Sequence, residues 1–108
     1  MTEDDVRRIA LALPQAEEHD HHGRPSFRVG TKLFVTMPQA GRANLRLPME
    51  EHRALIAERP DVFRDVVWGQ LHRTGVDLAA IEADELAELI ETAWAEVAPK
   101  KLVRERFG

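Results

Sequence analysis

The chain has 108 residues, a formal net charge of −4 at pH 7 and no cysteine, and 44% of its residues are hydrophobic. This length fits one domain built around a single core. The lack of cysteine excludes disulfides, thiolate metal sites and a thiol nucleophile, and the negative charge argues against a protein that binds nucleic acid over its whole surface.

The charge is unevenly distributed along the chain. Residues 1–23 carry six acidic and two basic side chains, whereas residues 24–73 carry nine basic and five acidic ones. Residues 74–98 contain seven acids and no Lys or Arg, and residues 99–108 contain four basic residues and one acid. A polarised surface of this kind can select partners even when the total charge is small.

The first residues predict a helix. Thr2 and Asp5 have the spacing of a capping box, and apolar residues then recur at helical intervals as far as Leu13. Pro14 ends this pattern. Residues 15–25 are polar and are predicted to form a loop.

The periodicity then changes to two. Apolar and mostly polar residues alternate in residues 26–29, 33–37 and 43–47. Gly30 and Thr31 have the Gly-X form of a tight hairpin turn, and residues 38–41 form a second turn. This pattern predicts three antiparallel strands in meander order, each with one apolar face.

The second half predicts a short helix between Pro48 and Pro60, then strands over about 62–68 and 73–78. Asp84 is predicted to cap a long C-terminal helix. The apolar stripe of that helix consists of Leu86, Leu89, Ile90, Ala93, Trp94 and Val97. The resulting order α-β-β-β-α-β-β-α indicates a single two-layer α+β domain, with the helices packed on one face of an antiparallel sheet.

Four stretches carry a family resemblance: HGRPSFRVGTKLF, NLRL, RPDVFRD with WG after it, and VDLAAIEADELAELIETAWAEVAPKKL. They resemble parts of the MmcQ/YjbR family of small bacterial proteins, and the likeness runs from about Val6 to Leu102. The resemblance implies an α-β(3)-α-β(2)-α fold akin to that of type III secretion chaperones. It also implies DNA binding, a designation that rests on a comparison with double-wing DNA-binding folds.

The chain departs from this family at two places. Members often have an aromatic residue or a Gly-Trp pair before the fifth strand, where this chain has residues 71–75, LHRTG. A capping residue such as Asp is common before the second helix, where this chain has Leu47 and Pro48.

The segment from residue 17 to residue 22 is rich in metal-binding side chain types: Glu17, Glu18, His19, Asp20, His21 and His22. Metal sites draw ligands at defined spacing from fixed elements, whereas successive residues of a loop point in different directions. We interpret the segment as a solvated polar loop, with a metal site as the alternative. We expect no metal centre and no cofactor.

No arrangement of residues indicates catalysis. Ser26 is the only serine, and it lacks the Gly-x-Ser-x-Gly context of a nucleophile elbow. The glycines form neither a phosphate-binding loop nor a dinucleotide fingerprint. We therefore expect a protein that is not an enzyme. Trp94 is predicted to lie in the core, and Trp68 is predicted to pack in the core or at its rim.

One surface remains a candidate binding site. If the apolar residues of the three-stranded meander face the helices, pleating directs the intervening residues to the opposite face. The candidate binding residues are Arg28, Lys32, Phe34, Arg42, Asn44 and Arg46, and Thr36 shares their face. Cations and an amide suit a phosphate backbone, and Phe34 is available to stack on a base. The alternative is a charged face that maintains solubility and discourages edge pairing.

The sequence therefore predicts a bacterial cytoplasmic protein, without a membrane segment, that binds DNA or another polyanion weakly and in a salt-dependent manner. A small anionic ligand is a further alternative. The competing function is a chaperone-like interaction module that receives a protein segment on the sheet face or edge. The basic tail, Lys100, Lys101, Arg104 and Arg106, adds to the basic face if it folds toward the sheet.

Overall fold

The computed structural model describes residues 1–108, which form four α-helices and a six-stranded antiparallel sheet. The helices are α1 (Glu3–Leu11), α2 (Met49–Glu58), α3 (Ala83–Val97) and α4 (Lys100–Phe107), and a 3-10 helix η1 (Leu78–Ala80) precedes α3. The strands are β1 (Ala16–His21), β2 (Arg24–Val29), β3 (Lys32–Gln39), β4 (Arg42–Leu45), β5 (Phe63–Trp68) and β6 (Leu71–Asp77). Their order across the sheet is β1-β2-β3-β4-β6-β5.

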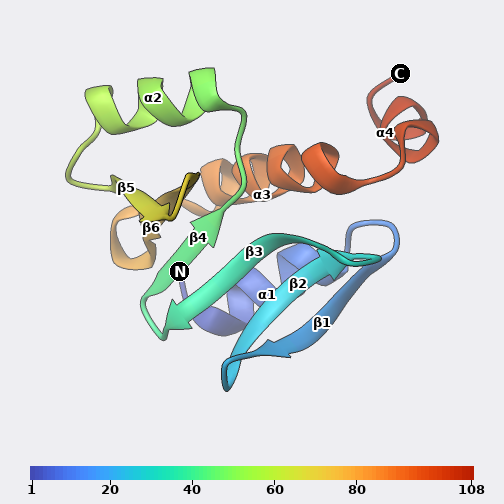
Figure 1. Ribbon diagram of the computed structural model, residues 1–108, viewed down its shortest axis with the longest axis horizontal. Helices are drawn as coiled ribbons and strands as arrows, with labels where there is room; N and C mark the ends of the chain where they lie inside the picture. Colours follow the sequence, from blue (N-terminus) through green and yellow to red (C-terminus); the bar gives the residue numbers. More distant parts are fainter.

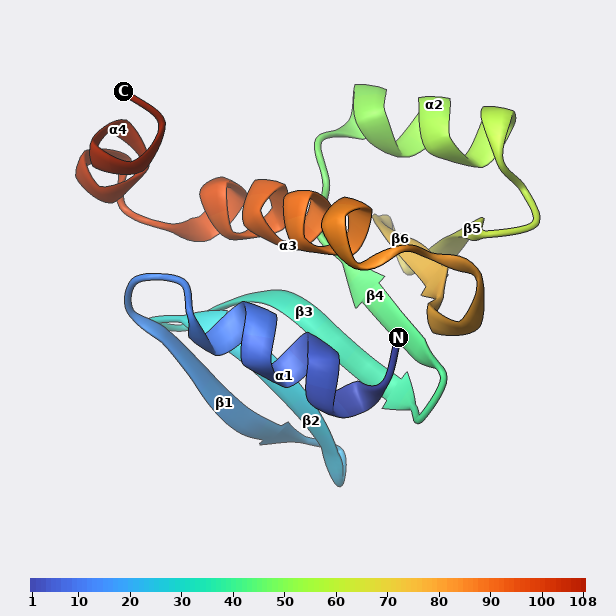
Figure 2. The ribbon, with the colours of Figure 1, turned by 180° about the vertical axis from the view of Figure 1, so that it is seen from behind.

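The helices α1, α2 and α3 cover one face of the sheet. Helix α1 lies behind β2 and β3 in Figure 1 and in front of them in Figure 2. Helix α3 packs on β2, β3 and β4, and α2 packs on β5 and β6. We call the opposite face the outer face. The predicted two-layer α+β class is confirmed, with one additional strand and one additional helix.

The core lies between the helices and the sheet and contains one cluster of 22 buried hydrophobic residues. The predicted apolar stripe of α3 is buried, and Trp94 has no exposed surface. The Nε1–H of Trp94 donates a 2.9 Å hydrogen bond to the carbonyl of Pro14, which ties α3 to the segment after α1. No helix combines the length and the apolar character that crossing a bilayer requires.

The predicted loop over residues 15–25 is wrong, because residues 16–21 form the edge strand β1. This strand pairs with β2 in antiparallel register, so that His21 lies opposite Arg24. The two residues between them, His22 and Gly23, both have positive φ, at 55° and 80°. Two central residues of this kind make a type I′ turn, whose twist suits a hairpin. The strand therefore forms through pairing and turn geometry rather than through apolar alternation.

The predicted pleat of the second meander strand is wrong at its centre. Phe27 pairs with Val35, and the next pair is Arg28 with Leu33, so Phe34 is an additional residue in β3. An additional residue of this kind is a β-bulge, and it reverses the alternation on one side of the bulge. Phe34 is only 1% exposed and belongs to the core.

The ends of the helices agree in part with the prediction. Thr2 and Asp5 form the predicted capping box at the start of α1. Helix α3 begins at Ala83 after Glu82, so Asp84 lies within its first turn and is not the cap. Helix α4 folds against α3, where Arg106 forms an ion pair with Glu91. The end of the basic tail is therefore anchored to a helix rather than to the outer face.

Candidate nucleic-acid interface

A row of small and polar residues crosses the middle of the outer face. Directly opposed residues on neighbouring strands share a face, and the pairing runs from Ser26 to Thr36, then to Asn44, and from Asn44 to Gly75. Ser26 is fully buried even though it lies on this side of the sheet. Its hydroxyl donates a 3.0 Å hydrogen bond to the carbonyl of His19. The small side chains of this row form the floor of a recess.

Two hairpin tips close over this floor from opposite edges of the sheet. His21 is the last residue of β1 and His22 lies in the turn after it, while Trp68 is the last residue of β5. The ring of Trp68 lies 5.8 Å from that of His21 and 6.4 Å from that of His22, measured between centroids. Strands β1 and β5 are the two edge strands, so this contact shows that the outer face is concave.

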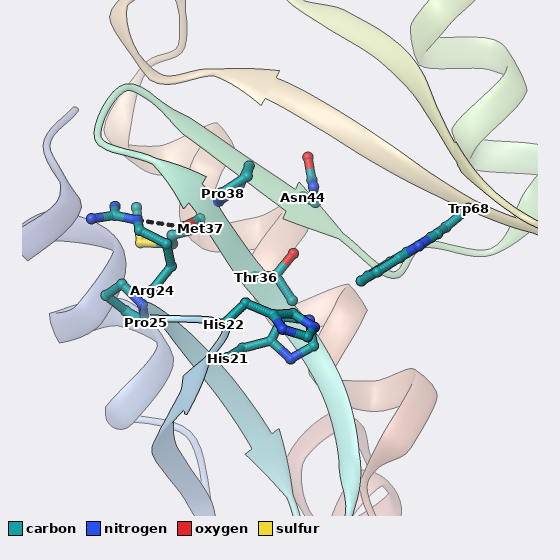
Figure 3. A pocket seen from close by; sticks show the side chains of 9 residues that line it. All are labelled: His21, His22, Arg24, Pro25, Thr36, Met37, Pro38, Asn44 and Trp68. Carbon is teal, nitrogen blue, oxygen red and sulfur yellow. Dashed lines mark hydrogen bonds between the residues drawn. The ribbon is translucent and has the colours of Figure 1, made fainter.

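Trp68 stands between two cavities that share this floor. The first, of about 240 Å³, lies between Trp68 and the two histidines, and Thr36 and Asn44 line it (Figure 3). The second, of about 140 Å³, also touches Thr36, Asn44 and Trp68, and it extends to Leu71 and Arg73. Trp68 is 62% exposed. Its ring therefore borders both cavities and remains accessible to a ligand.

Arg24 lines the first cavity, but its guanidinium is engaged elsewhere. Its Nε–H donates a 3.0 Å hydrogen bond to the carbonyl of Met37, and its guanidinium pairs with Glu3 of α1. In Figure 3 this guanidinium points away from Trp68. Arg24 is therefore a structural link between the sheet and α1 rather than a free cation of the recess.

Five arginines surround the recess on the outer face. The cross-strand register places four of them there: Arg28, Arg42, Arg64 and Arg73. The fifth, Arg46, directly follows β4 and lies near Arg73. None of them has a carboxylate within 4.0 Å, although five other arginines of the chain form such pairs. Glu17 and Asp77 occupy register positions opposite Arg28 and Arg42 on this face without forming ion pairs. The outer face therefore carries an excess of unpaired positive charge.

Two of these arginines repel each other. Burial lowers the pKa of Arg73 from its ordinary value, and the positive charge of Arg46 lowers it further. A guanidinium remains protonated at neutral pH in any protein environment. The proximity of these two charges means that an anion bound between them would relieve their repulsion.

Two nitrogens near the recess lack hydrogen-bond partners. Nε2 of His21 and Nε of Arg28 are buried from solvent, and neither forms a hydrogen bond within the protein. Buried polar atoms of this kind are uncommon and indicate a water molecule or a ligand that completes them. His21 lines the first cavity, so a bound molecule there can provide the missing partner.

The structure separates the predicted binding residues into two groups. Arg28, Arg42 and Asn44 lie on the outer face, and Arg46 lies beside the outer-face Arg73. Lys32 pairs with Val29, whose side chain is in the core, and therefore points to the helix side of the sheet. The outward placement of Lys32 is thus wrong. The outward placement of Phe34 is also wrong, because the bulge turns its ring into the core, so it is not free to stack on a base.

The three histidines of the opening cluster do not form a metal-binding group. His21 and His22 border the recess beside Trp68, while His19 lies near Glu17 on the edge strand. Sequence reasoning also missed Arg64, Arg73 and the exposed position of Trp68. The alternation of residues along β5 and β6 could have indicated that Arg64 and Arg73 face outward. The contact between the β1–β2 and β5–β6 hairpins could not be predicted, because it depends on the curvature of the sheet.

Comparisons with known proteins agree on the fold. The family model described as YjbR matches residues 11–96. The crystal structure of Deinococcus radiodurans protein DR2400, described with the domain DUF419, superposes with a TM-score of 0.77 and is 21% identical. The superposition covers 96% of this chain and 86% of that one. No curated protein matches the sequence.

Proposed function

The chain belongs to the YjbR family, and from this premise we propose that it binds DNA on the concave outer face of its sheet. The observation that carries the proposal is the set of five arginines without ion-pair partners that surrounds a recess containing an exposed tryptophan. We propose a binding role rather than a catalytic one. Such a role belongs in the cytoplasm, where a bacterium keeps its DNA.

The arginines suit a phosphate backbone. A guanidinium presents several donors in a planar fork that matches phosphate oxygens, and it stays charged at all physiological pH values. Arg46 and Arg73 are close enough to lower the pKa of Arg73, so one phosphate bound between them would reduce their repulsion. Contacts of this type provide affinity without sequence preference, and salt weakens them.

The recess suits an unpaired base. A base stacks well on an aromatic ring, and this stacking contributes about 1–3 kcal/mol per base. Trp68 offers a ring for this purpose, and the amide of Asn44 and the hydroxyl of Thr36 lie on the same cavity wall. The recess is narrow, because the rings of Trp68 and His21 lie 5.8 Å apart between centroids, and an unpaired base needs less room than a base pair. We therefore propose that single-stranded DNA binds more tightly than duplex.

The test is a salt titration of oligonucleotide binding, followed by fluorescence anisotropy with a labelled single strand and the matching duplex. The variant Arg28→Ala/Arg42→Ala/Arg46→Ala should bind more weakly. Its slope of log K against log salt should be shallower by about 0.7 for each phosphate of the single strand that it no longer binds. Trp68→Ala should lower the affinity with little change in that slope, because stacking is not a charge contact.

The matched control is Arg53→Ala, since Arg53 is an exposed arginine on α2 outside any ion pair. It should bind as the wild type does. The proposal is wrong if the wild type fails to bind either oligonucleotide at low salt, or if the control loses as much affinity as the triple variant.

A second candidate function is the binding of a protein segment at the β5–β6 hairpin. Val67, Trp68 and Leu71 are all more than half exposed there, and β5 is an edge strand. An exposed edge beside apolar side chains can receive an added strand. This function would be supported over DNA binding by a protein partner that stays bound after nuclease treatment and at high salt. The variant Trp68→Ala/Leu71→Ala should fail to bind that partner.

A further inference from the structure

Two histidines and an aspartate meet on the other face of the β5–β6 hairpin, beneath α2. Nε2 of His52 lies 3.0 Å from Oδ1 of Asp65, and Nδ1 of His72 lies 2.9 Å from the same oxygen. All three ligand atoms lie within 4.8 Å of one another. The group is separate from the outer face, because Asp65 is opposite the fully buried Thr74 in the sheet.

We propose that His52, Asp65 and His72 bind a divalent transition-metal ion of the zinc type. Two imidazole nitrogens and one carboxylate oxygen are ligands that zinc prefers, and with three protein ligands one position remains open. Bonds of about 2.0–2.2 Å in a tetrahedral site place neighbouring ligand atoms roughly 3.3 Å apart. The two measured separations of 3.0 and 2.9 Å are close to that value.

A hydrogen bond to Thr74 orients His52, the buried ligand of the proposed site. The side chain of His52 is 4% exposed, whereas those of Asp65 and His72 are 40% and 38% exposed. Nδ1 of His52 forms a 2.7 Å hydrogen bond with the hydroxyl of the fully buried Thr74. A partner on the second ring nitrogen orients a ligating histidine and fixes its tautomer. Nε2 of His52 is thereby directed toward Asp65, and the open position faces solvent.

The same contact explains why a cation suits this place. If Nδ1–H donates to Thr74, a neutral His52 presents the lone pair of Nε2 to a carboxylate, and the two repel unless a proton or a metal ion lies between them. An aspartate carboxyl is ionised at neutral pH, so Asp65 supplies the negative charge that a bound cation would neutralise.

A catalytic explanation of the group does not fit the burial. Thr74, His52 and Asp65 follow the connectivity of a hydroxyl–imidazole–carboxylate triad. The nucleophile of such a triad must reach the substrate, and the Thr74 hydroxyl belongs to a residue with no exposed surface. A metal ion, by contrast, needs access only past the partly exposed Asp65 and His72 to reach Nε2 of His52. This proposal departs from the sequence-based expectation of no metal centre. The three ligands come from α2, β5 and β6, so no sequence spacing reveals them.

The test is isothermal titration calorimetry, in which Zn²⁺ is added to the untagged protein and to three variants. The wild type should bind one ion, and His72→Ala and Asp65→Asn should each weaken that binding by more than about 100-fold, beyond the range known for removal of a residue that only orients a ligand. The triple variant His19→Ala/His21→Ala/His22→Ala should retain the site, which separates it from adventitious binding by the histidine-rich hairpin.

A second readout keeps the result independent of any change in folding. Zinc should raise the midpoint of thermal unfolding of the wild type and of the triple variant but not of His72→Ala, since a ligand stabilises only the state that binds it. The proposal fails if the wild type binds no zinc, if His72→Ala binds it as tightly as the wild type, or if the triple variant loses the site. None of these readouts depends on DNA binding.

Discussion

The hydroxyl oxygen of Thr74 lies 2.7 Å from Nδ1 of His52, and both residues are buried between α2 and the sheet. The hydrogen bond joins the middle of β6 to the only buried residue of α2. It thus fixes α2, a helix without a side-chain cap, to the part of the sheet that carries the β5–β6 hairpin.

The variant Thr74→Val tests this link. Valine keeps the shape of the side chain but leaves a buried ring nitrogen without a partner, which costs about 1–3 kcal/mol. The free energy of unfolding, measured by urea titration, should fall by that amount. Thr36→Val is the control, because Thr36 is a partly exposed strand residue whose hydroxyl forms no hydrogen bond in the protein, and its change should stay within about 0.5 kcal/mol. Equal losses in the two variants would contradict the assignment.

The bulge in β3 gives a second prediction. Phe34→Ala should lower the free energy of unfolding by about 3–5 kcal/mol, since its ring is almost fully buried in the core. Leu33→Ala should cost only about 1 kcal/mol, because Leu33 is partly exposed on the outer face. Urea denaturation of both variants decides the matter. A larger loss for Leu33→Ala than for Phe34→Ala would contradict the bulge. It would mean that β3 keeps a regular pleat, with Phe34 on the outer face.

The same bulge shows where sequence reasoning fails in this fold. Residues 33, 34 and 35 are all apolar, so alternation alone leaves their direction open, and the regular pleat placed Phe34 outside. The additional residue becomes visible only in the pairing of β3 with β2. Arg42 and Asn44 lie on β4, whose pairing with β6 has no such shift, and periodicity predicted their direction correctly.

Strand β1 illustrates a different limit. Its residues are mostly carboxylates and histidines, which have little preference for strands. It forms because β2 offers a free edge and because His22 and Gly23 permit a two-residue turn. The recess and the metal-binding group are harder still to foresee. His21 and Trp68 are far apart in sequence, and His52, Asp65 and His72 follow no spacing motif, so only the folded sheet brings each set together.

The cap of α1 gives a prediction about pH. The backbone N–H and hydroxyl of Thr2 donate hydrogen bonds to the carboxylate of Asp5, and together with Arg8 they lower its pKa from 3.8 to about 2. A carboxyl group with a lowered pKa in the folded state stabilises the protein above its unfolded pKa, and this contribution disappears as the pH falls through the folded value.

The variant Asp5→Ala should therefore be less stable than the wild type at neutral pH. The difference between the two should shrink as the pH falls from 3.8 toward about 2, because protonation of Asp5 removes the same interactions from the wild type. Urea midpoints across this range measure the effect. A difference that stays constant with pH would mean that the charge of Asp5 does not contribute. Asp4→Ala is a useful comparison, since Asp4 lies in the same turn but forms no bond to Thr2.

The last prediction concerns Gly75, which occupies the floor of the outer face between Asn44 and Arg64. A Cβ atom at this position would lie 2.8 Å from Cγ2 of Val66 and 3.0 Å from Cγ of Arg64. Gly75→Ala should therefore destabilise the protein by about 1–3 kcal/mol, the usual cost of overpacking. Gly41→Ala is the control, because a Cβ there meets nothing within 4 Å and its φ is not positive, so it should be neutral or slightly stabilising.

The double variant Gly75→Ala/Val66→Ala shows whether the clash is the cause. Removing Cγ2 of Val66 gives the new methyl group room, so the double variant should be more stable than the sum of the two single losses indicates. Additive losses in urea denaturation would instead attribute the effect to the backbone of Gly75. Since Val66 and Arg64 share the outer face with the recess, Gly75→Ala should also weaken oligonucleotide binding, whereas Gly41→Ala should leave it unchanged.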